Sequence, residues 1–474
     1  MPRRHQQQQS EEEDWLSVLT DDILLSILVR VNLKTAARTS VLSTRWVHLP
    51  WLLPEFSINA KEFLSGPCRD PDKENGIEEA MASLTKATRS FLAYRQRDSI
   101  ISNLHLKLYL MKTFLYEVGP MVSDAINSGL LKDLDLAILD DTVPRDCSDV
   151  YMVQRGKEMD GFFSAYPSVL HCLTKLSLRN LGFNKLDMHH ILFDCCKQLK
   201  HLSLYHCDNG ASSWFKIDAP NSKLSVLELT LCRFERLEVV CLPKLEKLSW
   251  DTWMTPDMPL AIGFIPSLGE LVLSCGAVCA DSGTKLSEFL HATTSIHTLS
   301  LDFQGESLWL QPEMKQLCTA FRKLRKLSVR GIFVEFDILW TMAFLVAAPS
   351  IEMLQIEVWE HACDVEQLDD EDRRRTNSER RNPEWEMDLG SSKSWLLKEL
   401  EFVGFRSLEQ QFTLIRSVLE RSPNLQKIFL KDDEECDSCA ALGAPSKFPK
   451  KDDQEMVVRR ITDGTFLPQI IFDD

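Results

Sequence analysis

Two short clusters in this chain combine residue types that can bind a metal ion or act in catalysis. Cys436 and Cys439 are separated by two residues, which is the spacing of a pair of zinc ligands. A tetrahedral zinc site needs four ligands and no second pair follows nearby, so we predict no metal site there. His189 and His190 precede an apolar run, and we expect them on the surface of a helix rather than on a metal.

Motifs that hold a nucleotide or activate a serine are absent from the sequence. It contains no Gly-x4-Gly-Lys-Ser/Thr loop, no dinucleotide fingerprint and no Gly-x-Ser-x-Gly. We therefore predict a protein that is not an enzyme in its own right and that needs no cofactor. Its function is then to be sought in binding surfaces.

Composition limits the partners of such surfaces. The 474 residues carry 70 acidic and 54 basic side chains, a net charge of −16, which argues against binding to nucleic acid. No apolar run approaches the roughly 18 residues of a membrane span, and the polar start MPRRHQQQQSEEED is not a secretory signal. The 14 cysteines show no disulfide framework, which favours reduced thiols in the cytoplasm or nucleus.

The most regular feature is a repeated Leu-x-x-Leu-x-Leu pattern. Successive starts between Leu173 and Ile351 are 21 to 28 residues apart, the period of leucine-rich repeats. The motifs span Ile101–Leu106, Leu131–Leu136, Leu173–Leu178, Leu199–Leu204, Leu224–Leu229, Leu245–Trp250, Leu268–Leu273, Ile296–Leu301, Leu324–Val329, Ile351–Ile356, Leu397–Phe402 and Leu425–Leu430. Each unit should add one strand to a parallel sheet, and stacked units should share one core.

Alternation along each strand then separates core residues from an exposed concave face. Trp250 falls at a core position, and Cys207 and Cys232 fall where this repeat takes Asn or Cys, so we predict buried neutral thiols. The middle exposed row reads Ser177, Ser203, Glu228, Ser249, Val272, Ser300, Ser328, Gln355 and Glu401. The next row reads Arg179, Tyr205, Thr230, Asp251, Ser274, Asp302, Arg330, Glu357 and Val403. Aromatic residues and arginine dominate interface energies, so Arg179, Tyr205 and Arg330 are the predicted target contacts, although any one of them could be an ordinary solvated residue.

A second dense apolar stretch lies near the N-terminus, from Asp14 to Trp51. Thr20 can cap a helix that Asp21 and Asp22 favour in its first turn, and Asn32 is a predicted helix stop. Further short helices fit Lys34 to Leu42 and Ser43 to Leu49. Three helices in under forty residues cannot bury all of these apolar side chains, so part of that surface should belong to a partner.

Residues 15–51, and above all the run RTSVLSTRW from Arg38 to Trp46, resemble the F-box of plant F-box/leucine-rich-repeat proteins. Thr20 and Asn32 stand where that family commonly has proline. The strand–helix–strand pattern from Leu396 to Leu430 is similar to the FBD-type region of the same proteins. The resemblance implies docking to a Skp-family adaptor and, through it, to a cullin-based ligase. The implied adaptor contacts are Leu19, Ile23, Leu24, Ile27, Leu28, Val41, Leu42 and Trp46.

These patterns predict an α/β chain in which a small three-helix F-box precedes a leucine-rich-repeat horseshoe with a parallel concave sheet. The predicted segments are a disordered N-terminus (1–13), the F-box (14–52), a linker with a packing helix (53–100), the repeats (101–358), a charged disordered loop (359–395), an FBD-like cap (396–431) and a charged tail (432–474). Asp140 to Met159 is expected to form a loop within the repeats.

The predicted function is that of a substrate-recognition subunit of an SCF-type ubiquitin ligase. Such a subunit binds the adaptor through its F-box and a target protein through its repeats. The alternative is a repeat scaffold or inhibitor that does not involve ubiquitin. A third possibility, small-ligand sensing at the concave face, is known in related receptors, but no residue pattern in the chain specifies a ligand.

Overall fold

The computed structural model describes residues 15–64, 73–93, 100–183, 187–210, 213–255, 257–277, 285–290, 293, 295–305, 308–310, 317–334, 336–359, 394–433, 446–462 and 468–473. The predicted disordered start, residues 360–393 of the predicted charged loop and the Cys436–Cys439 pair lie outside these residues. The chain divides into two compact units, Met1–Leu139 with Gly161–Thr174 and Asp140–Asp160 with Lys175–Asp474.

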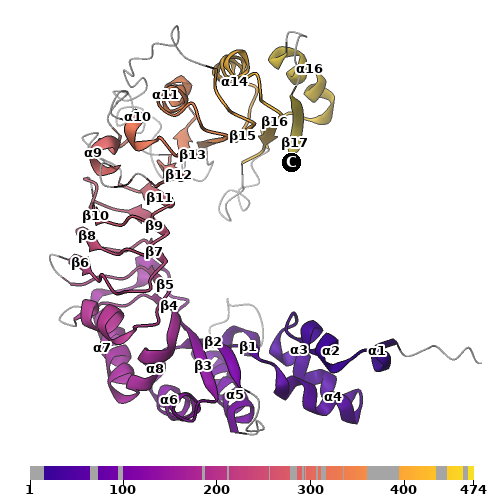
Figure 1. Cartoon of the computed structure of the whole chain (residues 1–474), viewed down its shortest axis with the longest axis vertical. Helices are drawn as coiled ribbons and strands as arrows, with labels where there is room; N and C mark the ends of the chain where they lie inside the picture. The colour runs from indigo at the N-terminus through magenta and orange to yellow at the C-terminus, as the bar shows by residue number, and fades with distance from the viewer. Residues whose placement is uncertain are drawn as a thin grey trace, which may run out of the picture. The chain divides into compact units, whose positions relative to one another are not determined.

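The first unit contains the predicted N-terminal helices and a short parallel sheet in the order β1-β2-β3 (Figure 1). Its helical elements are α1 (Trp15–Val18), α2 (Asp21–Leu28), α3 (Leu33–Arg38), η1 (Thr39–Val41), α4 (Thr44–His48), η2 (Leu49–Leu52), η3 (Ala60–Phe63), α5 (Lys73–Ala93), α6 (Lys112–Asn127) and α8 (Pro167–Cys172). Its strands are β1 (Glu55–Asn59), β2 (Ile101–Tyr109) and β3 (Leu131–Leu139).

An aromatic cluster joins the N-terminal helices to this sheet. The ring of Phe91 on α5 lies 4.5 Å from that of Trp51 on η2 and 5.2 Å from that of Phe56 on β1. The helix predicted between the F-box and the repeats is therefore present as α5, and it packs against β1 and β2. Strand β1 was not predicted, and it places the start of the sheet before residue 101.

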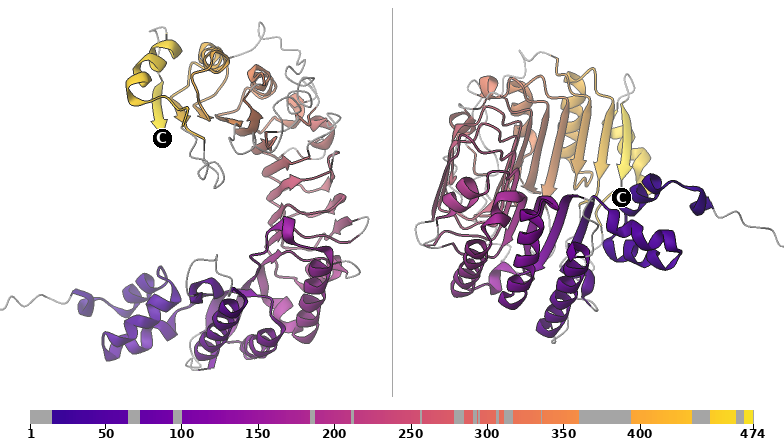
Figure 2. Two further views of the ribbon diagram at one scale, coloured as in Figure 1. Left: turned by 180° about the vertical axis from the view of Figure 1, so that it is seen from behind. Right: turned by 60° about the horizontal axis from the view of Figure 1, so that its bottom comes forward.

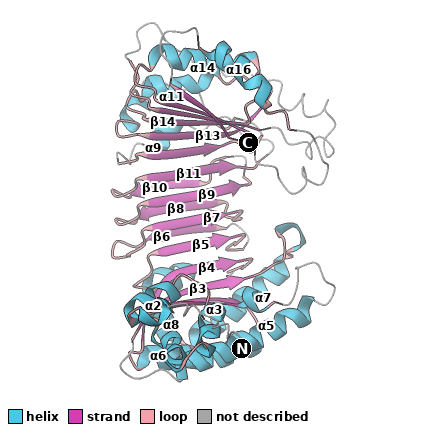
Figure 3. Ribbon diagram, turned by 90° about the vertical axis from the view of Figure 1, so that its right-hand side faces the viewer, coloured by secondary structure: helices cyan, strands magenta, loops and turns pink. Residues whose placement is uncertain are grey.

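In the second unit every strand of the main sheet is parallel to its neighbours, in the order β4-β5-β7-β9-β11-β12-β13-β14-β15-β16-β17. Figure 3 shows these strands stacked one above another. Their bounds are β4 (Leu173–Arg179, which begins in the first unit), β5 (His201–Tyr205), β7 (Val226–Thr230), β9 (Lys247–Trp253), β11 (Glu270–Cys275), β12 (Thr298–Asp302), β13 (Lys326–Phe333), β14 (Met353–Trp359), β15 (Glu399–Val403), β16 (Lys427–Lys431) and β17 (Gln469–Asp473). Each predicted motif from Leu173 onward overlaps one of these strands, which confirms the predicted fold class.

One face of this sheet is covered by the segments that return between strands (Figure 1). Three of them pair as a second parallel sheet in the order β10-β8-β6. The returning elements are η4 (Pro144–Asp146), α7 (Asp149–Ala165), η5 (His190–Cys195), β6 (Trp214–Asp218), β8 (Arg236–Cys241), β10 (Leu260–Phe264), α9 (Leu286–Leu290), α10 (Leu317–Ala320), η6 (Leu339–Thr341), α11 (Met342–Ala347), α14 (Glu409–Arg421) and α16 (Lys451–Ile461).

The core between the main sheet and the returning segments contains a series of aromatic contacts. Trp250, predicted as a core residue, is fully buried, and its ring lies 6.5 Å from Phe234 and 6.4 Å from Trp253. Trp253 in turn lies 5.0 Å from Trp309. Edge-to-face ring pairs of this kind add packing energy beyond the burial of apolar area. Neighbouring repeats therefore share one continuous core, as stacking units require.

A left-handed turn recurs where a strand of the main sheet ends. Asn180, His206 and Leu231 have positive φ values of 53°, 47° and 52°, and each backbone N–H donates to a carbonyl of the next strand, at 2.8 to 3.0 Å. At the equivalent position within β13, Gly331 has a φ of 64°. The turn redirects the chain into the return segment while it keeps the hydrogen-bond ladder intact.

One sequence prediction is wrong in this unit. The segment from Asp140 to Met159 is largely helical, because α7 starts at Asp149. The backbone of α7 packs closely against the Gly182 carbonyl at Gly156. Only glycine permits this contact, because a side chain there would collide with the carbonyl oxygen. The predicted charged tail after residue 431 contains one helix, α16, and one strand, β17, among its described residues. In Figure 2, β17 is drawn in yellow at the end of the sheet, where it pairs with β16.

Candidate functional site

The helices of the first unit leave large apolar side chains exposed to water. We call these residues the apolar helix surface: Leu16, Val18, Ile23, Ile27, Val41 and Leu42. Val41 and Leu42 are the most prominent pair, with exposed fractions of 85% and 60%. Ile23 and Ile27 lie one turn apart on the same side of α2. Covering each such side chain would stabilise a complex by roughly 1–3 kcal/mol.

Four of the eight predicted adaptor contacts, Leu19, Leu24, Leu28 and Trp46, are not part of this surface. Leu24, Leu28 and Trp46 have exposed fractions of 0%, 2% and 8%, so the prediction that they meet a partner directly is wrong. Helices α2 and α4 both pack against η2, and these side chains form the small core between them. Leu19 is half-buried. Leu16 and Val18 were not predicted as adaptor contacts. The only indication in the sequence is that both are apolar and lie on either side of polar Ser17.

Polar contacts fix how these helices are arranged. Asn32 was predicted to end a helix, but it begins the next one, since its side chain accepts a hydrogen bond from the Thr35 backbone N–H at 2.8 Å. Its φ of −64° is not left-handed, so the basis of the prediction does not hold. Thr20 stands at the start of α2 without capping it through its side chain. Arg45, within the run that resembles the F-box, donates to Asp21 and to the Leu19 carbonyl.

The second candidate surface is the exposed face of the main sheet in the second unit, which we call the open face. Its middle row lies in continuous register from Ser177 to Glu401, as predicted, and extends to Phe429 and Ile471. The next row is in register from Arg179 to Asp251, and β-bulges interrupt it after β9 and within β13. The strands therefore present both predicted rows on one face, except that Ser274 of the second row is buried.

The three predicted target contacts on the open face differ in their surroundings. Arg179 and Tyr205 are direct neighbours, and the guanidinium carbon lies 3.9 Å from the centre of the tyrosine ring. Arg330 instead forms an ion pair with Glu357, whose Oε2 accepts from Nε at 2.7 Å. Cation–π stacking leaves the outer nitrogens of a guanidinium available, whereas an ion pair already uses them. The structure thus brings Arg179 and Tyr205 together and leaves Arg330 elsewhere.

On the open face between Arg179 and Arg330, several charged side chains are paired with one another. Glu228 contacts His201 at 2.9 Å and Lys247 at 3.6 Å, and Lys247 also reaches Glu270 at 3.1 Å. Burial acts to raise the pKa of Glu228, but hydrogen bonds from His201 and Lys247 outweigh it and lower that pKa. This part of the open face presents neutralised charges rather than a field of one sign.

The predicted buried thiols are confirmed. Cys207 and Cys232 are almost completely buried, and their Sγ atoms contact the Leu178 and Leu204 carbonyls at 3.7 and 3.3 Å. Burial raises the pKa of Cys207 and raises that of Cys232 to about 12. Both thiols therefore remain protonated and occupy equivalent positions in neighbouring repeats.

One group on η5 has the residue types of a nucleophilic site. His190 lies between Cys195, at 3.5 Å from Sγ, and Asp194, at 3.2 Å from Oδ2. The His190 and Asp194 side chains are about 60% exposed, so water competes for both contacts. His189 contacts the Asp218 backbone instead. Among the described residues, no three His, Cys, Asp or Glu side chains are placed to hold a metal ion.

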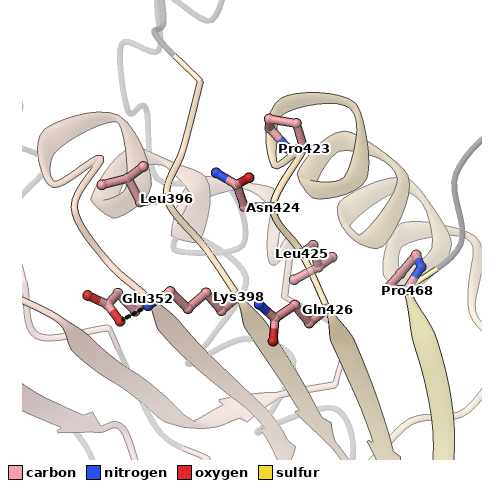
Figure 4. Close-up of a pocket in the computed structure, with 8 residues that line it drawn as sticks. All are labelled: Glu352, Leu396, Lys398, Pro423, Asn424, Leu425, Gln426 and Pro468. Carbon is pink, nitrogen blue, oxygen red and sulfur yellow. Dashed lines mark hydrogen bonds and ion pairs between the residues drawn. The ribbon is translucent and has the colours of Figure 1, made fainter.

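A shallow pocket of about 660 Å³ lies at the starts of β14 to β17 (Figure 4). Glu352, Lys398, Gln426 and Pro468 each immediately precede a strand there. The Lys398 ammonium donates to Glu352 at 2.6 Å, and this hydrogen bond lowers the pKa of that carboxyl. The two charged residues that line the pocket are therefore paired with each other.

Among the described helices, none is long and apolar enough to cross a bilayer.

Stacked parallel strands in constant register, with one buried and one exposed face, define the class of leucine-rich-repeat proteins. Comparison with known families agrees. Residues 164–459 match the model described as At1g61320/AtMIF1, LRR domain. The match covers more than half of the sequence, and the chain belongs to this family.

Curated relatives of this chain are named for F-boxes. The putative F-box/FBD/LRR-repeat protein At5g44950 of Arabidopsis thaliana is 22% identical over 455 residues, which are 88% of this chain and 92% of the relative. The F-box protein At5g03100 of the same plant is 26% identical over 329 residues, 68% and 90% of the two chains. A solved structure, the yeast complex of Rad7 and Elc1, has a chain that matches with 13% identity and a TM-score of 0.31, over 88% of this chain and 85% of that one.

Proposed function

We propose that this protein is the substrate-recognition subunit of an SCF-type ubiquitin ligase. The N-terminal helices bind a Skp-family adaptor, and the open face of the repeats binds a target protein. The observation that carries the proposal is the apolar helix surface: six large apolar side chains are exposed on α1, α2 and η1 and at Leu42 directly after η1. Covering an exposed apolar surface lowers the free energy of the chain in water, and such surfaces commonly mark protein–protein interfaces.

Position in the chain and similarity support this assignment. The exposed Val41 and Leu42 lie within the run that resembles the F-box, and Leu24, Leu28 and Trp46 form the core that supports them. The relatives reported above are themselves named F-box proteins. The similarity to At5g44950 covers 88% of this chain.

In such a ligase this chain contributes no nucleophile of its own. It holds the target near the catalytic module, where the effective concentration of target lysines is high. We place this activity in the cytoplasm or nucleus. The partners are an adaptor, a cullin and a protein target, without nucleic acid or a membrane.

Reconstitution with a Skp-family adaptor, a cullin module and the ubiquitin-activating and -conjugating enzymes tests the proposal. The full chain should co-purify with the adaptor and support ubiquitin transfer to itself or to a bound protein. Replacing Ile23 and Ile27 by Asp should abolish both, because charged side chains cannot be buried unpaired in the interface. Capture of the adaptor without any ubiquitin transfer would favour a scaffold or inhibitor instead, and absence of capture would refute the assignment.

A further inference from the structure

The strongest feature on the open face that the ligase assignment does not explain is the state of Arg179. Its guanidinium is stacked on the ring of Tyr205, yet its Nε is buried without a hydrogen-bond partner. Within the described part of the chain, no carboxylate forms an ion pair with it. Leaving a buried hydrogen-bond donor without an acceptor costs free energy. An oxyanion that accepted hydrogen bonds from this guanidinium would form a strong, charge-assisted contact.

The same face provides a direct comparison. Arg330 belongs to the same row as Arg179, but Glu357 from the neighbouring strand accepts its Nε hydrogen bond. On the strand beside Arg179 the equivalent residue is Tyr205, which offers a π-face in place of a carboxylate. The fold therefore orients both guanidinium groups through the next repeat, and it supplies an anion to only one of them.

The side chains next to Arg179 on the open face are short and polar. Ser177 and Ser203 pair directly with each other one row away, are half-buried, and carry short hydroxyl side chains that can donate hydrogen bonds. Thr230 lies beside Tyr205 on the other side. Nearby, the pKa of His206 is lowered by burial and then by the charges of Arg233 and Arg179. A neutral His206 imidazole adds no positive charge beside Arg179.

We propose that Arg179 and Tyr205 form an anion-binding site for an acidic side chain of the target protein, either a carboxylate or a phosphorylated hydroxyl. Arg179 supplies the charge and planar donors, which suit both oxyanions. Tyr205 holds the guanidinium in place, and Ser177 and Ser203 supply further donors. This inference rests on the proposed function, because it assigns the chemistry by which the open face selects its target.

Peptide libraries with one fixed central residue and random flanks test the site on the purified full chain. The fixed residue is phosphoserine, glutamate, serine or glutamine. The wild-type chain should retain anionic peptides about tenfold better than their neutral counterparts, and this preference should fall with added salt. Preference for phosphoserine alone assigns a phosphate, and preference for both anions assigns any carboxylate or phosphate.

Arg330→Gln is the matched control, since it removes an arginine of the same row whose charge is already paired. Arg179→Gln should lose the anionic preference, whereas Arg330→Gln should keep it. Tyr205→Phe should keep most of the preference, because the ring remains, and Tyr205→Ala should weaken it. Equal behaviour of the two arginine variants, or no anionic preference in the wild type, would overturn the site. Adaptor capture by Arg179→Gln should stay unchanged, so failure here is distinguishable from failure of the ligase assignment.

Discussion

Arg45 on α4 donates a hydrogen bond from Nε to Oδ1 of Asp21 at 2.7 Å, and its Nη2 donates to the Leu19 carbonyl at 2.5 Å. Two residues 24 positions apart thus join the start of α2 to α4. The second contact gives the Leu19 carbonyl, which lies outside any helix, a hydrogen-bond donor from the protein in place of water. Arg45 is therefore a residue that fixes the arrangement of the helices below the apolar helix surface.

Replacing Arg45 should cost more stability than replacing its acidic partner. Arg45→Ala removes both hydrogen bonds and should lower the free energy of unfolding of this region by about 1–3 kcal/mol. Asp21→Asn removes only an exposed ion pair, which is worth at most about 1 kcal/mol. Hydrogen exchange of the α2 and α4 amides measures both effects. Equal changes in the two variants would show that the contact to Leu19 contributes nothing.

The contact between α7 and the repeats can be tested with two glycines of the same helix. A Cβ at Gly156 would lie 2.1 Å from the Gly182 carbonyl oxygen, whereas a Cβ at Gly161 meets nothing within 4 Å. Gly156→Ala should therefore destabilise the protein by about 1–3 kcal/mol. Gly161→Ala should be neutral or stabilise it by up to about 1 kcal/mol, because alanine favours a helix. Urea unfolding midpoints that shift equally in both variants would contradict this contact.

His105 in the first unit should make stability depend on pH. Its Nδ1 lies 2.8 Å from Asp135, and its Nε2 lies 2.8 Å from Glu55. The hydrogen bond to Asp135 and then that to Glu55 raise the pKa of His105 above 6.5, against an opposing effect of burial. A raised folded-state pKa contributes stability that is fully present below about pH 6.5 and is lost as pH rises through the folded value.

The measurement is the thermal midpoint of the wild type and of His105→Gln across that range. The wild type should exceed the variant most clearly near pH 6, and the difference should shrink by pH 9. The Asn103 side chain, which donates to Asp135 at 3.4 Å, is present in both proteins, so its contact does not contribute to the difference. A difference that grows with pH would mean that His105 is neutral in the folded chain.

Much of this fold can be predicted from the sequence because each repeat carries its own signal. The alternation of leucines marks both the strand and its buried side, and the register of the middle row followed from it. Strand β1 was missed because EFSIN lacks the repeated leucines, and α7 because no apolar stripe runs along one side of it. The strands β6, β8 and β10 are short returns that lack the repeated leucine motif, so the pattern used to find the main strands did not mark them.

The candidate sites were less predictable for a different reason. An amphipathic pattern marks which residues avoid water, but it does not say which are covered by the chain itself. Leu28 and Ile27 are neighbours of similar type, yet one is buried and the other 42% exposed. Likewise, Arg179 and Arg330 occupy one row, and only the residue on the next strand, Tyr205 or Glu357, decides which is paired. That residue lies about one repeat away in sequence.

The buried cysteines should resist alkylation in the folded protein. At pH 8, iodoacetamide should label the exposed Cys318 at least about 100-fold faster than Cys207 or Cys232, whose thiols are held protonated. Peptide mass spectrometry reads each site separately. The difference should vanish in urea, where all thiols are exposed. Rapid labelling of Cys232 in the folded chain would show that this part of the core opens readily.

Calorimetric titration of a Skp-family adaptor into the full chain tests the central claim most directly. Replacing both Val41 and Leu42 by Asp should weaken binding by about 100-fold or more, because exposed apolar contacts become unpaired charges in the interface. Phe264→Asp is the matched control, since Phe264 is 61% exposed, like Leu42 at 60%, but lies in the second unit. The account predicts wild-type affinity for this control. Equal affinity of the wild type and the Val41/Leu42 variant would contradict it.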